Sequence, residues 1–321
     1  MGAPPVRSFL LRRLAALVPV LAGVSVVIFL LMHLAPGDVT TTLLGPQATE
    51  ADRVALRRAL GLDQPVPVQY ARWVVRVAEG DLGTSIATSR PVAALIVPRF
   101  LNTALLAVAS LALAVGIGYG AGLLAALRPR SVMDRVLTGA TLLLGSTPPF
   151  WLGLVLVLFF ALRLRWLPVS GMTDMAGDGG GLDVARHLVL PAVTTALGPA
   201  AIITRLVRSS VLDAMGRPHV RVARAKGLGR GALLRRHVIL NALPPIMTIT
   251  GLQLGYLLGG ALFSEVVFAW PGLGSLLYDS ITARDTPVVQ AATLLIALLF
   301  VVVNVLVDLV NAALDPRMKE T

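Results

Sequence analysis

The chain has 321 residues, of which 56% are hydrophobic and 14% are charged, and its mean hydropathy is +0.80. These values are typical of a protein whose main solvent is lipid rather than water. The complete lack of cysteine excludes disulfide bonds, thiolate nucleophiles and cysteine metal sites.

Six apolar runs approach or exceed the ~20 residues of helix that are needed to cross about 30 Å of hydrocarbon. They lie near residues 14–34, 101–127, 136–162, 188–204, 242–263 and 288–309. The sequence therefore predicts an all-α integral membrane protein with six transmembrane helices. The first run follows several arginines, but it exceeds the apolar segment of a typical signal peptide, so we interpret it as a retained anchor. Pro191 and Pro199 interrupt the fourth run, and neighbouring helices would have to satisfy its freed backbone groups.

The segment between the first two runs, residues 35–100, is the longest connection in the chain. Thr49 and Asp52 have the spacing of a helix N-cap and its partner. Farther along, four residues recur at helical spacing and form an apolar stripe: Tyr70, Trp73, Val74 and Val77. We expect this helix to rest on the membrane surface or on the helix bundle, and a substrate-binding face is the alternative.

Small and polar residues mark the second and third runs. Four alternating glycines of the second run favour close packing with a neighbouring helix: Gly116, Gly118, Gly120 and Gly122. Asn102 opens the second run, and Ser146 and Thr147 precede two prolines within the third. These polar side chains are candidates for lining a pathway, and hydrogen bonding between helices is the commoner use of such residues.

The stretch after the fourth run is rich in arginine and contains a predicted short helix. Arg217 and Pro218 begin this helix, and Gly227 and Gly229 end it, which leaves about nine helical residues. Arg217, Arg221 and Arg224 fall on one stripe, and four small residues permit close backbone approach: Ala223, Ala225, Gly227 and Gly229. A short helix with these features can dock into a groove on a partner protein. The alternative is that the charges only hold the loop in the cytoplasm.

The last two runs contain further polar candidates for the pathway. Glu265 opens "EVVFAWPGLG", which also contains Phe268 and in which Pro271 and Gly272 prevent a continuous helix. A re-entrant turn near the pathway mouth is one interpretation, and an ordinary loop with an exposed Glu265 is the other. Asp308 lies in the sixth run, where a charge at mid-membrane costs ~2.5–3.5 kcal/mol, so we expect a structural partner or water beside it.

The distribution of charge predicts the orientation of the chain. If both termini are cytoplasmic, most of the 28 Lys and Arg residues lie inside, and most of the 17 acidic residues lie outside. This asymmetry satisfies the positive-inside rule and favours an N-in, C-in topology. The net charge of +11 therefore reflects topology and requires no nucleic acid partner.

The sequence lacks the usual motifs of enzymes and metal sites. Lys226 and Lys319 are the only lysines, and neither closes a phosphate-binding G-x-x-x-x-G-K-[ST] loop. No two histidines have zinc-ligand spacing, and "GTSIA" at 83–87 lacks the last glycine of a nucleophile elbow. We therefore expect no catalytic residue and no metal site. A secondary transporter would show internal repeats and ionisable residues at mid-membrane, and we find neither.

The pattern "ARAKGLG…I…NALP" resembles the EAA loop of ABC importer permeases, in which a short coupling helix docks into a cytoplasmic ATPase. Ala223 replaces the initial glutamate of that motif, and Leu243-Pro244 arrives two residues late, as in the peptide-importer branch of OppB/DppB type. Blocks similar to that branch occur in order nearly end to end: "APGD" (35–38), "LGLDQPVPVQYARW" (60–73), "GDLGTS" (80–85), "STPPFWLG" (146–153), "EVVFAWPGLGSLLYDSI" (265–281), "RDTPVVQ" (284–290) and "LVDLVNAALDPR" (306–317).

The resemblance implies a type I ABC importer permease fold in a multi-pass protein of the bacterial cytoplasmic membrane. Its partners would be a second, homologous permease subunit in a heterodimer, two ABC ATPase subunits and an extracytoplasmic solute-binding protein. ATP and Mg would bind the ATPase subunits, so this chain would be non-catalytic and would bind no cofactor. The expected solutes are di- and oligopeptides, and nickel or another small solute is the alternative.

The resemblance also assigns residues to the coupling helix and its end: Arg217, Arg221, Ala223, Arg224, Ala225, Lys226, Gly227, Leu228 and Gly229. We expect two parts in the chain. Residues 1–100 would form an N-terminal anchor and an extracytoplasmic loop with short amphipathic helices. Residues 101–316 would form a five-helix permease core, with the coupling loop at about 208–240.

Overall fold

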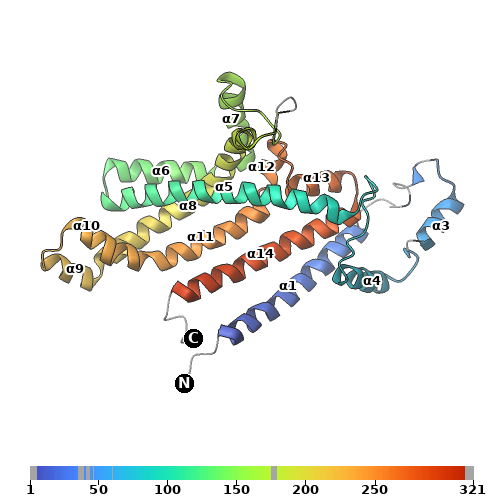
Figure 1. Cartoon of the computed structure of the whole chain (residues 1–321), viewed down its shortest axis with the longest axis horizontal. Helices are drawn as coiled ribbons and strands as arrows, with labels where there is room; N and C mark the ends of the chain where they lie inside the picture. The colour runs from blue at the N-terminus through green and yellow to red at the C-terminus, as the bar shows by residue number, and fades with distance from the viewer. Residues whose placement is uncertain are drawn as a thin grey trace.

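The computed structural model describes residues 6–34, 40, 44–45, 47–59, 61–174 and 179–314. Within these ranges the chain is helical apart from its connections, and Thr84 and Pro91 form the only β-type bridge. The long helices lie along one common direction in Figure 1. The expected all-α architecture is confirmed.

The described helices are α1 (Val6–Leu34), α3 (Glu50–Ala59), α4 (Val66–Ala78), α5 (Val92–Leu127), α6 (Val132–Ser146), α7 (Pro149–Leu156), α8 (Gly181–Gly216), α9 (Pro218–Ala225), α10 (Arg230–Leu233), α11 (Leu240–Gly260), α12 (Leu262–Val267), α13 (Leu273–Thr282) and α14 (Thr286–Leu314). Two π-helical turns, Val157–Arg163 and Leu234–Ile239, continue α7 and α10. Within the described ranges, five stretches are long and apolar enough to cross a membrane: 17–34, 92–127, 181–216, 230–259 and 286–309.

The third expected span differs from the prediction because it is broken. Thr147 has extended backbone angles (φ −76°, ψ 132°), since the residue before a proline avoids the helical region. Pro149 then begins α7 in a first-turn position, where its missing amide costs nothing. The pair formed by Val132–Ser146 and Pro149–Arg163 is therefore bent by 104°. The described residues therefore contain five candidate spans, or six if this bent pair counts as one.

The long helices α5 and α8 pack closely through two glycines. A Cβ added at Gly118 would lie 2.6 Å from Ile203, and one added at Gly122 would lie 2.7 Å from Val207. The predicted close packing is thus confirmed for Gly118 and Gly122. Gly116 and Gly120 are exposed and meet nothing within 4 Å.

The fourth span is longer than predicted, because α8 runs from Gly181 to Gly216 through both of its prolines. Two hydroxyl groups donate to the backbone at the first proline. The carbonyl oxygen of Pro191 accepts hydrogen bonds from Thr195 Oγ1 at 2.8 Å and from Ser264 Oγ at 3.1 Å. The second of these bonds ties α12 to α8, because Ser264 belongs to α12.

The helix α4 rests on α1 through the predicted aromatic stripe. Tyr70 Oη and Ser25 Oγ share a hydrogen bond of 2.8 Å, and the Phe29 ring lies 5.3 Å from Tyr70 and 5.7 Å from Trp73, centroid to centroid. This contact accounts for the aromatic part of the stripe as packing on the bundle, the first of the two interpretations given above.

The helix α3 has the predicted cap at its start. Thr49 Oγ1 donates to Asp52 at 2.6 Å and accepts from the Asp52 amide at 3.3 Å. The Thr49 hydroxyl, together with the Thr49 amide that donates to Asp52 Oδ2 at 3.2 Å, lowers the pKa of the Asp52 carboxyl. Gly61 follows the helix with a φ of +68°, which suits a glycine at a helix C-terminus.

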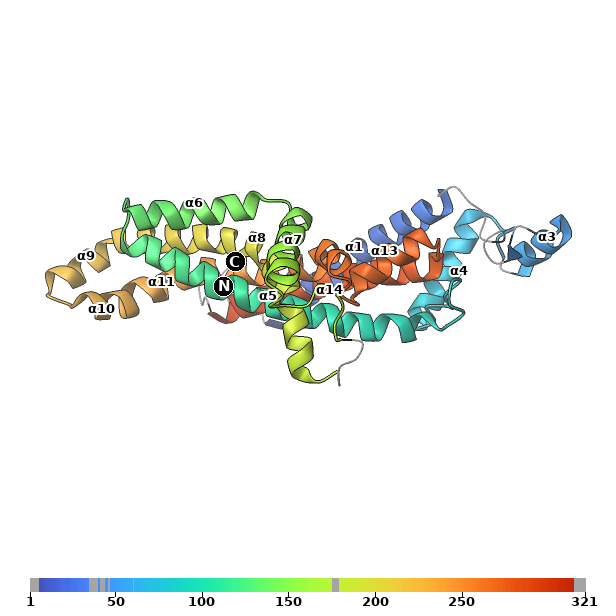
Figure 2. The ribbon, with the colours of Figure 1, turned by 90° about the horizontal axis from the view of Figure 1, so that it is seen from above.

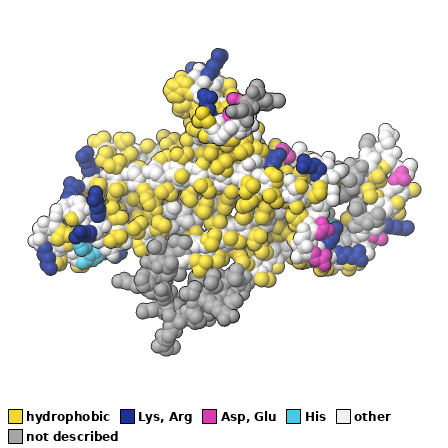
Figure 3. Space-filling model, viewed as in Figure 1, with side chains coloured by type: hydrophobic (Ala, Val, Ile, Leu, Met, Phe, Trp, Pro, Cys, Tyr) yellow, Lys and Arg dark blue, Asp and Glu magenta, His cyan; other side chains and the backbone are white. Residues whose placement is uncertain are grey.

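Charged side chains gather at the two ends of the bundle, and others lie on the protrusion that contains α7 (Figure 3). Figures 1 and 2 place α9 and α10 at one end of the long axis and α3 and α4 at the other, and α1 begins and α14 ends toward the side of α9. Figure 3 shows an apolar belt between these ends, with Lys and Arg gathered around α9 and α10. This arrangement is that of a multi-pass protein with its charged loops on opposite sides of a membrane.

Candidate functional site

The short helix predicted in the arginine-rich loop is α9, Pro218–Ala225. Pro218 occupies its first turn, and Gly227 follows it with a φ of +83°. The Gly227 amide donates to the Arg224 carbonyl at 3.0 Å, and the Leu228 amide donates to the Ala223 carbonyl at 3.3 Å. This is the hydrogen-bond pattern of a helix that ends at a left-handed glycine. The positive φ at the end of α9 is therefore a local reason for glycine at position 227, in addition to the close backbone approach expected from the sequence.

The two faces of α9 have different environments. Val220 and Ala223 are buried, at 0% and 8% exposed, and they pack in one cluster with Leu233 and Val238. The sequence predicts that Ala223 faces a partner, whereas in the structure Ala223 lies in the chain's own core. The remaining predicted coupling residues are exposed, except for the half-buried Leu228: Arg217, Arg221, Arg224, Ala225, Lys226, Gly227 and Gly229.

The buried face of α9 connects this loop to the membrane helices. The same cluster contains Val211 and Ala214 of α8 and Ala242 of α11. In addition, Arg230 of α10 donates to the carbonyl oxygen of Leu127 at 3.0 Å and so caps the last residue of α5. A displacement of α9 would therefore be transmitted to α8 and α11 through packed side chains.

An ion pair that the sequence argument missed lies near this end of the bundle. Arg208 of α8 donates from Nε to Asp134 Oδ1 at 2.6 Å and from Nη2 to Asp134 Oδ2 at 2.8 Å. Asp134 belongs to α6, so the bidentate pair holds α6 and α8 together. The sequence around Asp134 does not predict this ion pair, because its partner Arg208 lies 74 residues away.

Two of the predicted pathway residues lie at neighbouring cavities, the first between α6, α8 and α11 and the second also lined by α7 and α12. Ser146 lines a cavity of about 370 Å³ together with Arg205, Gln253 and Tyr256. Thr147 lines a neighbouring cavity of about 140 Å³, while its hydroxyl donates to the Leu143 carbonyl at 2.9 Å. Both cavities are bounded by Gly198 and Pro199 of α8.

Glu265 is fully buried and caps the start of α13. Its Oε1 accepts from Thr103 Oγ1 at 2.6 Å, and its Oε2 accepts from the Ser275 amide at 3.0 Å. Thr103 Oγ1 in turn accepts from the Leu273 amide at 2.8 Å. A Cβ at Gly272 would lie 2.2 Å from the Glu265 carboxyl carbon, so the carboxylate needs a glycine there. The re-entrant turn and the ordinary loop remain alternatives, but the exposed Glu265 of the second is wrong.

The other pathway candidates also lie in the packed interior or beside it. Asn102 Nδ2 donates to the Pro271 carbonyl at 2.8 Å, and the Asn102 carbonyl accepts from Trp270 Nε1 at 3.0 Å. Phe268 is 1% exposed and packs beside Val157 and Leu190, and Asp308 is half-buried on α14. Their contribution to a pathway stays a prediction.

Two of the sequence blocks quoted above meet at Ser85. Its hydroxyl donates to the buried carboxylate of Asp285, which also accepts from the Ile86 amide at 3.0 Å and the Ala87 amide at 3.3 Å. Ser85 is the serine of "GTSIA", and a hydroxyl that donates to a carboxylate in this way holds the loop against the start of α14.

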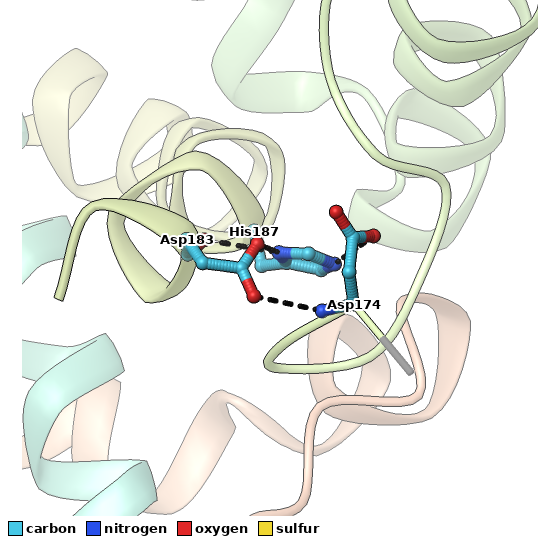
Figure 4. Close-up of side chains that lie close together, drawn as sticks. All are labelled: Asp174, Asp183 and His187. Atoms are coloured by element: carbon cyan, nitrogen blue, oxygen red, sulfur yellow. Dashed lines mark hydrogen bonds and ion pairs between the residues drawn. The ribbon is translucent and has the colours of Figure 1, made fainter. Parts of the chain in front are cut away.

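A histidine lies between two aspartates at the start of α8 (Figure 4). His187 Nδ1 lies 3.0 Å from the carbonyl oxygen and 3.2 Å from Oδ1 of Asp183, and Nε2 lies 3.6 Å from Oδ1 of Asp174. The Asp174 amide donates to Asp183 Oδ2 at 2.8 Å. Within the described residues this is the one group with metal-ligand proximity. Its contacts fasten the loop to α8, and the expectation of no metal site stays a prediction.

Two family models match the chain. Residues 6–107 match the N-terminal model of binding-protein-dependent transport system membrane components. Residues 118–320 match the model described as "Binding-protein-dependent transport system inner membrane component".

Three relatives align over nearly their whole length. The chain is 40% identical to the glutathione transport system permease protein GsiC of Salmonella typhi over 314 residues, which are 97% of this chain and 99% of that protein. It is 38% identical to the dipeptide transport system permease protein DppB of Alkalihalophilus pseudofirmus over 330 residues, with coverage of 97% and 99%. It is also 38% identical to the oligopeptide transport system permease protein AppB of Bacillus subtilis over 313 residues, again with coverage of 97% and 99%.

A solved structure shares the fold. It is an inward-facing conformation of the MetNI methionine ABC transporter, with a TM-score of 0.55 and 20% sequence identity. The match covers 71% of this chain and 100% of that chain. The helical core therefore has the fold of an ABC importer permease.

Proposed function

The chain belongs to the family of binding-protein-dependent transport system inner membrane components, and from that premise we propose that it is the permease subunit of an ATP-driven peptide importer. In this role it forms half of the pathway through the membrane. The observation that carries the proposal is α9, which exposes Arg221 and Arg224, with Arg217 exposed at its N-cap, while its other face packs in one cluster with residues of α8 and α11.

Coupling follows from this packing. The exposed face of α9 docks on a cytoplasmic ATPase subunit, and ATP binding there moves α9. Because Val220 and Ala223 share a core with α8 and α11, both helices move with α9. The pathway then opens alternately to the two sides of the membrane, which is a shift between two packed arrangements. ATP and Mg bind the ATPase subunits, and this chain carries out no catalysis of its own.

The substrate class follows from the relatives, whose names describe permeases for glutathione, dipeptides and oligopeptides. The same relationship implies a second permease subunit, two ATPase subunits and an extracytoplasmic binding protein, assembled in the bacterial cytoplasmic membrane. Nothing in the described residues favours nickel over a peptide.

The substitution Ala225→Trp tests the docking of α9. Ala225 is exposed, so an indole there fits the isolated chain but fills the space where a partner would approach. Overpacking of this kind typically costs about 1–3 kcal/mol, or roughly 5- to 150-fold in affinity. We expect the ATPase subunits to co-purify less and ATP-dependent uptake by proteoliposomes to fall.

The matched control is Ala93→Trp, because Ala93 is also exposed but lies at the start of α5 that is remote from α9. Its ATPase subunits should co-purify normally. Full assembly and uptake with Ala225→Trp would show that the loop is only a topological anchor. We prefer this substitution to one at Gly227, whose positive φ would add backbone strain to any steric effect.

A further inference from the structure

One stripe of α8 remains uncovered between its neighbours. The opposite side of the helix packs on α5 through Ala200, Ile203 and Val207, all of which are buried. Ile202 and Arg205 face away from α5 and are exposed. They line the cavity of about 370 Å³ that α6 and α11 flank, a volume within the range of small-molecule sites.

The cavity has largely apolar walls that carry three neutral polar side chains and one positive charge. Ser146 of α6 contributes a hydroxyl, and Gln253 and Tyr256 of α11 contribute an amide and a phenol. Gln253 is only 7% exposed, whereas Tyr256 is 58% exposed. No acidic residue lines the cavity, so the charge of Arg205 is not balanced there.

Arg205 differs in this respect from Arg208, one helical turn farther along α8. Arg208 is neutralised by the two oxygens of Asp134. No hydrogen bond or ion pair joins Arg205 to another residue in the described part of the chain. An arginine on a membrane-spanning helix normally faces a water-filled cavity or a partner and marks the path of a solute.

We propose that Arg205 binds the carboxylate at the C-terminal end of the transported peptide, while Ser146, Gln253 and Tyr256 contact its backbone. The inference rests on the proposed function, because it assigns a contact within that peptide pathway. A guanidinium offers a planar fork of donors that fits both oxygens of a carboxylate. The terminal carboxylate is the charged group that all unmodified peptides share, so this contact accepts peptides without reading their sequence.

The test compares two probes and two proteins. Proteoliposomes containing the full complex and saturating binding protein take up trialanine or its C-terminal amide, with wild-type Arg205 or with Arg205→Gln. The binding protein is the same in both complexes, so its own preference between the probes cancels in the ratio of wild-type to variant rates. We expect Arg205→Gln to reduce uptake of the free acid about 10-fold or more, since charge-assisted hydrogen bonds are lost, and to change uptake of the amide less than about 2-fold.

Two controls keep the result specific. Arg186→Gln removes an exposed arginine elsewhere on α8 and should leave the uptake rates of both the free acid and the amide unchanged. If Arg205→Gln fails to assemble, Ser146→Cys provides a second measurement in a chain that has no other cysteine. A maleimide should then label Cys at position 146 more slowly in the presence of the free acid than in the presence of the amide.

Each alternative gives a different outcome. Equal loss of both probes, or no loss of either, would overturn the assignment and leave Arg205 as a topological or lipid-binding charge. Equal maleimide labelling with the two peptides would overturn it as well. If the wild-type complex takes up neither peptide although its ATPase subunits co-purify, the proposed peptide function itself fails, and this inference fails with it.

Discussion

Replacing Glu265 by glutamine exchanges one carboxylate oxygen for an NH2 group at the point where α5, α12 and α13 meet. The carboxylate accepts from the Thr103 hydroxyl on one oxygen and from the Ser275 amide on the other. The side chain of glutamine has nearly the same shape but offers only one acceptor. Either the Thr103 hydroxyl or the Ser275 amide therefore loses its acceptor in Glu265→Gln, whichever way the amide group turns.

The size of the effect follows from burial. Glu265 is 0% exposed and Thr103 is 2% exposed, so water cannot replace the missing acceptor. A buried donor left without a partner costs about 1–3 kcal/mol. Thr103 Oγ1 already accepts from the Leu273 amide, so the threonine cannot turn away without breaking a second bond. We therefore expect the free energy of unfolding to fall by an amount in the upper part of this range, about 2–3 kcal/mol.

Thermal unfolding of the purified complex in detergent measures this loss. A protein of this size shifts by about 2–4 °C per kcal/mol, so we expect Tm to fall by about 4–12 °C. Glu79→Gln is the matched control, because Glu79 is exposed after α4 and should leave Tm within about 1 °C. An unchanged Tm for Glu265→Gln would refute the idea that both hydrogen bonds require a carboxylate.

Two further predictions follow from the packing and the topology. Gly122→Leu should lower the free energy of unfolding by about 1–3 kcal/mol, because a side chain there collides with Val207. Gly120→Leu should be tolerated, since nothing lies within 4 Å of a Cβ at that position. Equal Tm values for the two variants would contradict the close packing of α5 on α8. In intact cells, a membrane-impermeant maleimide should label Ala51→Cys on α3 but not Ala232→Cys on α10, since these exposed residues lie at opposite ends of the bundle, and the reverse pattern would show that the N-in topology is wrong.

The helical character of the chain and its main landmarks could be predicted from sequence because they depend on local chemistry. Runs of about 20 apolar residues predict spans, and a proline before and a glycine after a short amphipathic segment predict α9. Four alternating glycines at 116–122 predict close packing for the same reason, and the structure confirms it for Gly118 and Gly122. Each of these signals involves residues within a few turns of one another.

The tertiary structure decided what depends on distant residues. The third span bends by 104° at Thr147, and only the folded chain shows how far α7 turns from α6. Ala223 faces the core because Leu233 and Val238 return to cover it. Glu265 accepts a hydrogen bond from Thr103, 162 residues away. Arg208 pairs with Asp134, whereas Arg205 faces a cavity. The sequence alone determined which residues are charged or small, but the packing of helices determined which charges are neutralised, because burial and pairing are properties of the assembled bundle.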